Sequence, residues 1–408
     1  MPNEARRSSG FKHRTPLEVA RRRLLEILTP HDRTERLPLN MADGRVVAAT
    51  ITAPNPVPGY DRAAMDGFAV RAEDTVGASG RSPKILETTE AESPVSPGTA
   101  SRVHTGSELP EGANAVVMIE QLDETGETIA VRNAVAEGQN VGEAGEDVAE
   151  GQRLYEPGHR LRPSDLGLLR SVGLWEITVY KQPTVGVVPT GEELVEADPE
   201  PGEIIETNGL SVSQFVERWG GKATYRDIVT DDEAALRAAI QRDLTKDIIV
   251  TTGGSSVGER DLIPEVVDEL GEVVVHGVAI KPGYPVALGI VAETPIIMLP
   301  GYPVSCLLTA VQFLRPALKT VGHLPIEPLM SRQATLSRKL PSEPGTRTFV
   351  RVETTADDDR LLASPLRAKG AGILSSVALA DGWVVVPEDR EGYADGEQVT
   401  VEYWEAEP

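Results

Sequence analysis

Three glycine-rich loops in residues 251–305 each follow directly after a run of β-branched residues. The loops read TTGGSSVGERD, AIKPG and LPGYPVS, and the runs before them read DIIV, EVVVHGV and PIIML. Such runs, alternating with helix-like segments, predict an open α/β sheet in which each loop lies at the carboxyl end of a parallel strand. Residues 181–323 are therefore expected to form a doubly wound α/β domain.

The same loops predict a site for an anion. Open α/β sheets bind ligands at the carboxyl ends of their strands. Glycines free backbone N–H groups that can bind an oxyanion, and helix N-termini add partial positive charge. Lys281, in AIKPG, adds a point charge suited to phosphate. Each loop alone is also typical of an ordinary turn, so the prediction rests on the ordered set.

Composition limits the classes of partner. The 408 residues include 63 Asp and Glu against 40 Lys and Arg, a formal net charge of −23. This excess argues against a nucleic-acid partner, since phosphate contacts need positive surface, and it favours a salt-adapted protein over one with a functional acidic surface. No apolar run is long enough to cross a membrane, and the N-terminus lacks an apolar signal core. A cytoplasmic protein is expected.

Cysteine and histidine are poorly suited to metal or redox chemistry in this chain. The single cysteine, Cys306, excludes an internal disulfide and a cysteine-based zinc cluster. It lies in the apolar run CLLTAVQFL, which favours a buried core residue over a nucleophile. The six histidines show no metal-ligand spacing.

A chain of this length predicts several domains. In chain order we expect a helical linker domain, an inserted β-rich domain, the α/β domain and a small C-terminal antiparallel β-barrel or sandwich, at residues 1–50 with 150–180, 51–149, 181–323 and 324–408. TPLE, at the start of residues 15–28, is typical of a capping box that opens a helix. This helix and a short one near 40–47 are expected to pack with a helix at 162–173.

Acidic residues in turns indicate a second kind of chemistry. Asp66 lies in AAMDGFAV, Asp147 in GEAGEDVAEG, Asp261 in SSVGERD and Glu193 in PTGEEL. Each alone is also ordinary turn chemistry. Carboxylates beside an anion repel it unless a divalent cation bridges them, and Mg²⁺ binds one or two carboxylates together with phosphate oxygens. The combination predicts metal-assisted chemistry on a pyrophosphate-type ligand.

These segments resemble the MoeA and gephyrin E-domain family, the molybdenum insertases of molybdenum cofactor synthesis. The matching segments, in family order over nearly the whole chain, are AMDGFAV, TGSELPEGANAVVM, the GED turn, PTGEEL, GGSSVGERD, AIKPG and LPGYPVS. The resemblance implies an elongated homodimer of four domains, with an elongated linker domain through which it dimerises and a small β-barrel at the C-terminal end. Its cleft would lie between the α/β domain of one subunit and the inserted domain of the other. The implied reaction takes adenylylated molybdopterin and molybdate, inserts molybdenum and releases AMP, with Mg²⁺ required.

The resemblance also implies roles for individual residues. Those expected to act in catalysis are Asp66, Asp147, Glu193, Asp261 and Lys281. Those expected to bind molybdopterin or its phosphate are Thr105, Gly253, Gly254, Ser255, Ser256, Gly258, Pro300, Gly301, Pro303 and Arg351. Those expected to hold the metal are Glu193, Asp261 and one of the pair Asp231 and Asp232. Asp66 and Asp147 would complete the cleft from the partner subunit.

The chain departs from the family pattern at three positions. Bacterial relatives typically have a second lysine where KPGYP has Tyr284, and often asparagine where LPGYP has Tyr302. A serine expected after Gly370 is Ala371, with hydroxyls nearby at Ser375 and Ser376. Tyrosine supplies no positive charge, so weaker oxyanion binding is expected unless an arginine from elsewhere or high salt compensates.

Three other functions are compatible with parts of the sequence. The adenylyltransferase of the same pathway shares the α/β fold, but its glycine loop typically reads GGTG where this chain has GGSSVG. A non-catalytic pterin-binding scaffold could descend from an insertase through the changes at Tyr284 and Ala371. A generic α/β sugar or nucleotide enzyme leaves the N-terminal half unexplained. The choice between molybdate and tungstate stays open, as do the enzymes that receive the cofactor.

Overall fold

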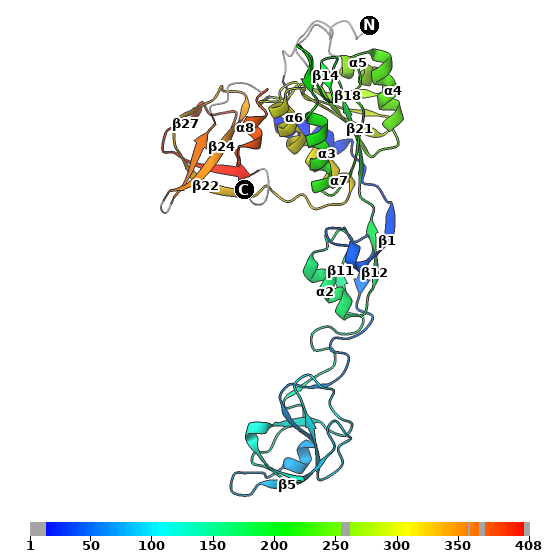
Figure 1. Ribbon diagram of the computed structural model, residues 1–408, viewed down its shortest axis with the longest axis vertical. Helices are drawn as coiled ribbons and strands as arrows, with labels where there is room; N and C mark the ends of the chain where they lie inside the picture. The colour runs from blue at the N-terminus through cyan, green and yellow to red at the C-terminus, as the bar shows by residue number, and fades with distance from the viewer. Residues whose placement is uncertain (1–13, 254–261, 358–359, 367–371, 404–408) are drawn as a thin grey trace. The chain divides into compact units, whose positions relative to one another are not determined.

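The computed structural model describes residues 14–253, 262–357, 360–366 and 372–403 (Figure 1). The chain forms two compact units, and the second is inserted into the first. Residues 1–34 and 180–408 belong to the first unit, and residues 35–179 to the second. Within the described residues, every helix is too short or too polar to span a bilayer.

A six-stranded sheet forms the centre of the first unit. In spatial order its strands are β16 (Lys222–Tyr225), β13 (Thr184–Pro189), β17 (Ile248–Thr252), β21 (Thr294–Leu299), β20 (Ala287–Val291) and β18 (Glu272–His276). The first four strands run parallel, while β20 and β18 pair antiparallel. This arrangement confirms the predicted, mainly parallel sheet.

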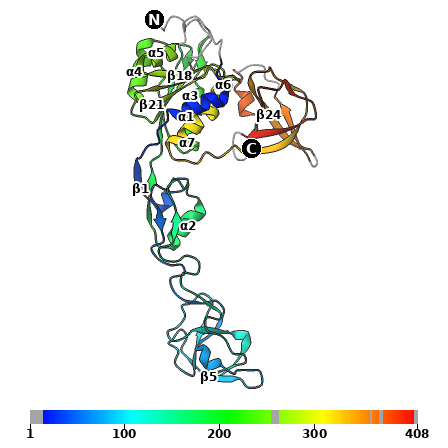
Figure 2. The same ribbon diagram turned by 180° about the vertical axis from the view of Figure 1, so that it is seen from behind.

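Helices cover both faces of this sheet, as in a doubly wound fold (Figures 1 and 2). Neighbouring strand residues point to opposite faces, so Val250 and Ile297 belong to one core, and Ile249 and Ile296 to the other. The first core is covered by α1 (Leu17–Glu26), α3 (Asn208–Arg218), α6 (Pro303–Thr309), the π-helical segment η4 (Ala310–Leu314) and α7 (Arg315–Val321). The second core is covered by α4 (Glu233–Asp243) and α5 (Leu262–Leu270).

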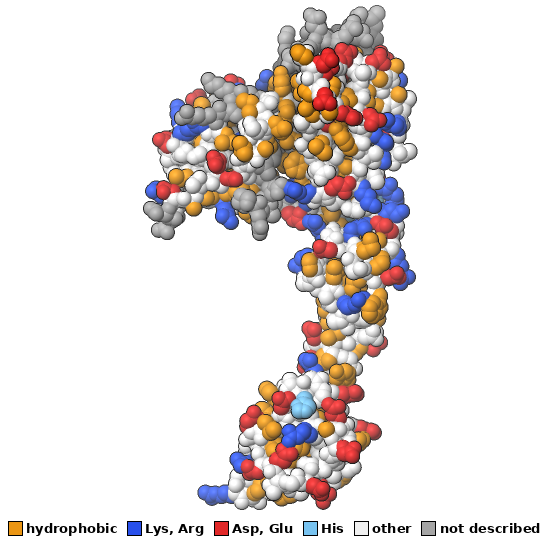
Figure 3. Space-filling view, viewed as in Figure 1, with side chains coloured by type: hydrophobic (Ala, Val, Ile, Leu, Met, Phe, Trp, Pro, Cys, Tyr) orange, Lys and Arg blue, Asp and Glu red, His pale blue; other side chains and the backbone are white. Residues whose placement is uncertain are grey.

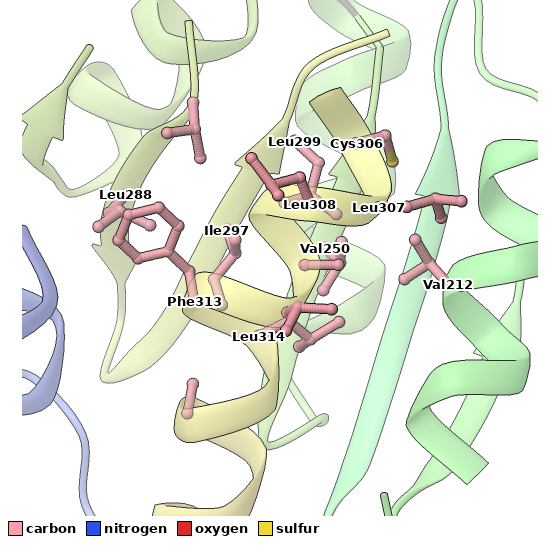
Figure 4. Packing of buried hydrophobic residues seen from close by; sticks show 14 of the residues in the cluster. Val212, Val250, Leu288, Ile297, Leu299, Cys306, Leu307, Leu308, Phe313 and Leu314 are labelled. Atoms are coloured by element: carbon pink, nitrogen blue, oxygen red, sulfur yellow. The ribbon is translucent and has the colours of Figure 1, made fainter. Parts of the chain in front are cut away.

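Cys306 lies in the first of these cores. Figure 4 draws it on α6 among apolar neighbours that include Leu307 and Leu308. The residue is 0% exposed, and burial raises the pKa of its thiol. A thiol in such surroundings stays protonated and unreactive. The prediction of a core cysteine is confirmed.

The first helix packs in the α/β core, and its expected packing with residues 162–173 is wrong. Leu17 and Leu24 of α1 are buried in the first core, whereas the later helix packs with Leu39 in the second unit. An apolar stripe shows that a helix buries one face but does not identify its partner. The TPLE capping box does not form either, because the Glu18 carboxylate pairs with Arg347, 2.6 Å away.

A five-stranded β-barrel follows the α/β domain and confirms the C-terminal prediction. Its strands are β22 (Ser331–Leu336), β24 (Arg347–Asp357), β25 (Arg360–Pro365), β26 (Gly382–Val386) and β28 (Gln398–Tyr403). Pairing of β24 with β26 closes the order β24-β25-β22-β28-β26. The short strand β19 (Ile280–Lys281) joins β24 in parallel. The remaining elements are β23 (Leu340–Pro341), β27 (Gly392–Tyr393) and α8 (Ser375–Ala378).

The second unit contains the β-rich part and the linker part. The β-rich part is a sheet ordered β7 (Ala115–Met118), β4 (Gly67–Val70), β6 (Thr99–Val103), β5 (Lys84–Thr89), β9 (Thr128–Val131) and β8 (Leu122–Thr125). Its core surrounds Phe68. Beside the sheet are β3 (Arg62–Ala63) with β10 (Val141–Gly142), and the turns η2 (Ala72–Thr75) and η3 (Ile119–Gln121).

The linker part holds one α-helix, α2 (Pro163–Ser171), and two short strand pairs. The pairs are β1 (Thr34–Pro38) with β12 (Glu176–Tyr180), and β2 (Ile51–Thr52) with β11 (Arg153–Tyr155). The helix expected near residues 40–47 is only the 3₁₀ turn η1 (Leu39–Met41). The turn ends at Met41, Gly44 follows with φ of 71°, and Val46 and Val47 then make isolated β-bridges.

Charged side chains are spread over both units. On the face drawn in Figure 3, Asp and Glu are interspersed with Lys and Arg. On this face the acidic side chains are dispersed and do not form one patch.

Candidate functional site

The first and third glycine-rich loops meet at the carboxyl edge of the sheet. Their strands β17 and β21 are parallel neighbours, and Thr252 is paired with Leu299. The Gly253 N–H donates to the Leu299 carbonyl at 3.1 Å. A Cβ on Gly301 would lie only 3.5 Å from the Gly253 Cα. The predicted residues Gly254, Ser255, Ser256, Gly258 and Asp261 lie outside the described part of the chain.

The second loop follows an edge strand that has no parallel neighbour but runs in the same direction as β17 and β21. The run EVVVHGV forms β18, which pairs antiparallel with β20 at the edge of the sheet. The reversed strand is β20, which also pairs antiparallel with β21 across the tight turn where Ala292 and Glu293 have φ of 46° and 71°. The carboxyl end of β18 therefore lies at the same edge of the sheet as those of β17 and β21. Tight turns between antiparallel strands usually carry Asn-Gly or Asp-Gly, so Ala-Glu gave no signal in the sequence.

The KPGYP turn, residues 281–285, packs against α6. Gly283 has φ of 106°, and a Cβ there would lie 2.5 Å from the Thr309 methyl group. Because α6 begins at Pro303, the last residue of LPGYP, this packing links the second loop to the third. The three loops are therefore connected through a helix and not through the sheet edge alone.

Lys281 is available to a ligand at this turn. Its side chain is 57% exposed, and its ammonium lies 3.3 Å from the Glu343 carboxylate, which is 75% exposed. An exposed pair of this kind contributes about 0–1 kcal/mol. A bound anion could displace Glu343 at little cost.

Buried hydroxyl groups gather at the carboxyl ends of β13 and β17, and the sequence reasoning did not select them. Thr190, Thr251 and Thr252 are each 1% exposed. Within the described residues, their Oγ1 atoms have no hydrogen-bond partner. Buried polar groups are nearly always paired, so these hydroxyls favour a polar ligand at this edge. Their only sequence signal is their place at strand ends beside glycine.

Asn208 is a second residue at this edge that the sequence reasoning missed. It opens α3, and its side-chain amide donates to the Gly301 carbonyl at 2.7 Å. This bond fixes the LPGYP turn against the start of α3. Of the other predicted residues, Pro300 is buried and Pro303 is the first residue of α6.

Acidic side chains gather beside the Thr190-Gly191 turn. Burial raises the pKa of Asp231, and the charges of Glu193 and Glu192 raise it further. In the described part of the chain, Asp231 Oδ1 has no hydrogen-bond partner. Asp232 instead accepts from the Ala235 N–H at 2.9 Å and caps α4. Of the predicted pair, Asp231 is therefore the one placed with Glu193.

The donor set fits a cation that keeps most of its waters. Across the residues described, no three His, Cys, Asp or Glu side chains are placed to hold a metal ion. Mg²⁺ needs only one or two protein carboxylates. The Asp231 oxygen, which lacks a hydrogen-bond partner among the described residues, and the neighbouring Glu193 satisfy that requirement.

Asp231→Asn is expected to stabilise the protein at neutral pH. Because the folded-state pKa of Asp231 is raised, its charge destabilises the fold at neutral pH, and this penalty is lost as the pH falls through that pKa. The gain at pH 7 should be about 1 kcal/mol or less, since solvent screens a half-buried group. Urea unfolding at several pH values measures it.

Asp232→Asn is the matched control, because asparagine also caps helices well and should leave stability nearly unchanged. An Asp231→Asn protein less stable than wild type at pH 7 would contradict a raised pKa for Asp231.

In the second unit, Asp66 is exposed and held by Thr105. Its Oδ1 accepts from the Thr105 N–H at 2.8 Å and from the Thr105 hydroxyl at 3.1 Å, and these bonds lower the pKa of Asp66. The His104 ring, which the sequence reasoning did not select, lies 3.8 Å from the same oxygen. The carboxylate is thus charged, oriented and open to solvent.

Asp147 is exposed on a turn that belongs to the same end of the β-rich part. Its N–H donates to the Val57 carbonyl at 3.0 Å, and the turn is held by an Ala144 N–H bond to the Asp61 carboxylate. Backbone bonds join the loops around it: Ala64 donates to Asn140, and Gly106 to Ala63. The structure therefore ties together the loops that carry Asp66, Thr105 and Asp147.

The barrel contributes one predicted residue in the described range. Arg351 lies half-buried on β24, and burial lowers its pKa. Ala371 lies outside the described residues, while Ser375 and Ser376 begin α8. Tyr302 is 60% exposed, and a Cβ on Gly372 would lie 3.5 Å from its ring. The barrel segment near residue 372 thus touches the LPGYP turn.

Family models define the class of protein that this fold and site represent. Residues 186–320, the α/β domain, match a probable molybdopterin binding domain. Residues 15–173 match the MoeA N-terminal region (domain I and II), and residues 333–404 the MoeA C-terminal region (domain IV). The chain belongs to the MoeA family.

Individual relatives agree over the full length. The molybdopterin molybdenumtransferase of Bacillus subtilis is 32% identical, over 96% of this chain and 95% of its own. The enzyme of that name from Haemophilus influenzae is 33% identical, over 95% of this chain and 98% of its own. A solved structure of the molybdopterin biosynthesis MoeA protein of Pyrococcus horikoshii has a TM-score of 0.85 at 33% identity, covering 97% of this chain and 100% of that one.

Proposed function

We propose that this protein is a molybdopterin molybdenumtransferase, an enzyme of molybdenum cofactor biosynthesis that inserts molybdenum from molybdate into adenylylated molybdopterin and releases AMP. The observation that carries the proposal is the polar sheet edge around Gly253 and Gly301, in a chain similar to such transferases along its whole length. The buried hydroxyls of this edge have no hydrogen-bond partner among the residues that the structure describes. Such an edge suits a phosphorylated ligand, because it offers backbone N–H groups and hydroxyls together.

Each group of residues has a distinct task in this proposal. The Gly253 loop and the threonine hydroxyls bind the phosphate end of the pterin ligand. Lys281 binds an anion at the KPGYP turn. Glu193 and Asp231 would hold Mg²⁺, which neutralises the negative charge of the phosphoanhydride when it is bound. Asp66, oriented by Thr105, and Asp147 act on the reacting groups.

The four-domain division, the homodimer, the cytoplasmic location and the adaptation to salt belong to the same proposal. Asp66 and Asp147 belong to the second unit, whereas Lys281 and Glu193 belong to the first. We propose that each cleft combines the second unit of one subunit with the first unit of its partner. The solution mass, from sedimentation equilibrium, tests the dimer, and activity across a range of KCl concentrations tests the salt adaptation.

The function is tested by AMP release. Purified protein, Mg²⁺ and adenylylated molybdopterin are mixed with molybdate or with tungstate, and AMP is measured by chromatography. We expect AMP only when oxyanion and Mg²⁺ are both present. No AMP with either oxyanion, in low or high salt, would favour a pterin-binding scaffold. Formation of adenylylated molybdopterin from ATP and molybdopterin would favour the adenylyltransferase.

A further inference from the structure

An arginine from the N-terminal segment lies beside the KPGYP turn. The guanidinium carbon of Arg14 is 5.1 Å from the centre of the Tyr284 ring. Thr15 is bonded into the neighbouring backbone: its N–H donates to the Gly277 carbonyl at 3.0 Å, and its carbonyl accepts from the Ala279 N–H at 2.8 Å. Because both the N–H and the carbonyl of Thr15 are hydrogen-bonded, the backbone next to Arg14 is fixed beside the turn.

The turn itself offers Arg14 a fixed platform. The Val278 N–H donates to the Tyr284 carbonyl at 2.9 Å, and the Val286 N–H donates to the Gly283 carbonyl at 3.2 Å. Gly283 packs on Thr309 of α6. The Tyr284 ring is half-buried and holds the guanidinium by a cation–π contact. Tyr284 therefore positions a positive charge although it carries none.

The acidic side chains around this turn are mostly engaged elsewhere. Glu18 pairs with Arg347, which also pairs with Glu388 at 3.2 Å. Glu343 pairs with Lys281 at 3.3 Å. Within residues 14–253, 262–357, 360–366 and 372–403, no acidic side chain forms an ion pair with Arg14. The turn thus has one cation in a weak exposed pair and a second that lies over an aromatic ring.

We propose that Arg14 and Lys281 together bind a tetrahedral oxyanion at the KPGYP turn, with Tyr284 as the positioning residue for Arg14. This inference rests on the proposed function, in which Lys281 binds an anion. A guanidinium held by stacking on its face keeps its N–H groups at the edge free for two parallel bonds to such an anion. The chemistry fits molybdate, and equally a phosphate group of the pterin substrate.

The test measures binding of molybdate, and separately of inorganic phosphate, to the full chain by titration calorimetry. Arg14→Gln should weaken binding at least about tenfold, as expected for loss of a charge-assisted hydrogen bond. Arg14→Lys should retain most of the affinity. Tyr284→Leu should lose about threefold, because the cation–π contact is gone, while Tyr284→Phe keeps the ring and most of the affinity. Glu343→Gln should bind more tightly, because the competing carboxylate is removed.

Arg22→Gln is the matched control. Arg22 is exposed on α1 and pairs only loosely with Glu26, at 3.7 Å. Arg22→Gln makes the same change in net charge as Arg14→Gln, and its affinity for either anion should equal that of wild type. Urea unfolding without anion should be the same for Arg14→Gln and wild type, which separates binding from folding.

Equal binding by wild type and Arg14→Gln would overturn the inference, as would equal weakening by Arg14→Gln and Arg22→Gln. Failure of wild type to bind either anion would overturn it too. A loss confined to molybdate, or to phosphate, supports the inference and identifies the anion. AMP release by wild type is measured separately, so the proposed function can stand when this site fails, and the site can stand when AMP release fails.

Discussion

Replacing Asp66 by alanine is expected to lower the rate of AMP release about 100-fold or more, the scale seen when one preorganised electrostatic group is removed from an active site. Asp66 is exposed, so its loss leaves no cavity, and urea unfolding should match that of wild type. Asp66→Asn should show nearly the same loss, because the amide oxygen can still accept from Thr105 while the charge is gone.

The control for this prediction is Asp43→Ala, which removes another exposed aspartate of the second unit. It should release AMP at the wild-type rate. Coexpression of Asp66→Ala with Lys281→Ala subunits tests the shared cleft, since each mixed dimer would contain one intact cleft and about half of the wild-type activity. An Asp66→Ala protein with full activity would refute the role of this carboxylate.

Gly253→Ala is expected to destabilise the protein by about 3 kcal/mol or more and to abolish binding at the sheet edge. Gly253 has φ of 127°, a conformation that alanine rarely adopts, and its Cβ would lie 2.0 Å from the Thr190 carbonyl oxygen. The backbone at Thr190 and at Gly253 must move to make room for the methyl group. This movement should separate Gly253 from the LPGYP turn, to which its N–H is now bonded at Leu299. The urea midpoint and the affinity for AMP measure the two effects.

Gly167→Ala is the matched control for the glycine. Gly167 lies in α2, and a Cβ there meets no atom within 4 Å. Alanine should stabilise this helix by up to about 1 kcal/mol. If Gly253→Ala has the same urea midpoint as wild type, the close contact between Gly253 and the Thr190 carbonyl does not contribute to stability, and the prediction is wrong.

The sequence predicted the strands and helices of the α/β domain because their apolar patterns are local and strong. The run DIIVTT became β17, and DDEAALRAAIQRDL became α4 with Asp232 as its cap. The seven family segments identified the family, which the full-length comparisons confirmed. The sequence also led to Gly253 and Gly301, which lie side by side in the structure, and to Lys281 as a predicted anion ligand.

Other features could not be read from the sequence, because they depend on which elements become neighbours. The Ala292-Glu293 turn reverses the chain without a turn signature, so β20 runs antiparallel between β21 and β18. The packing of the KPGYP turn on Thr309 of α6 likewise has no local signal. Asp231 and Asp232 are adjacent and cannot be distinguished in the sequence. In the structure Asp232 caps α4, whereas Asp231 lies half-buried beside Glu193.

By itself, the sequence determined the local elements, the family and most residues of the candidate site, since periodicity and motif order are properties of the chain. Only the tertiary structure decided how charge is supplied at KPGYP, where the sequence had only Tyr284 in place of a second lysine. Arg14, 270 positions earlier, reaches that ring because residues 14–15 are bonded beside Gly277 and Ala279. Contacts between residues so distant in the chain exist only after folding, since no local pattern encodes them.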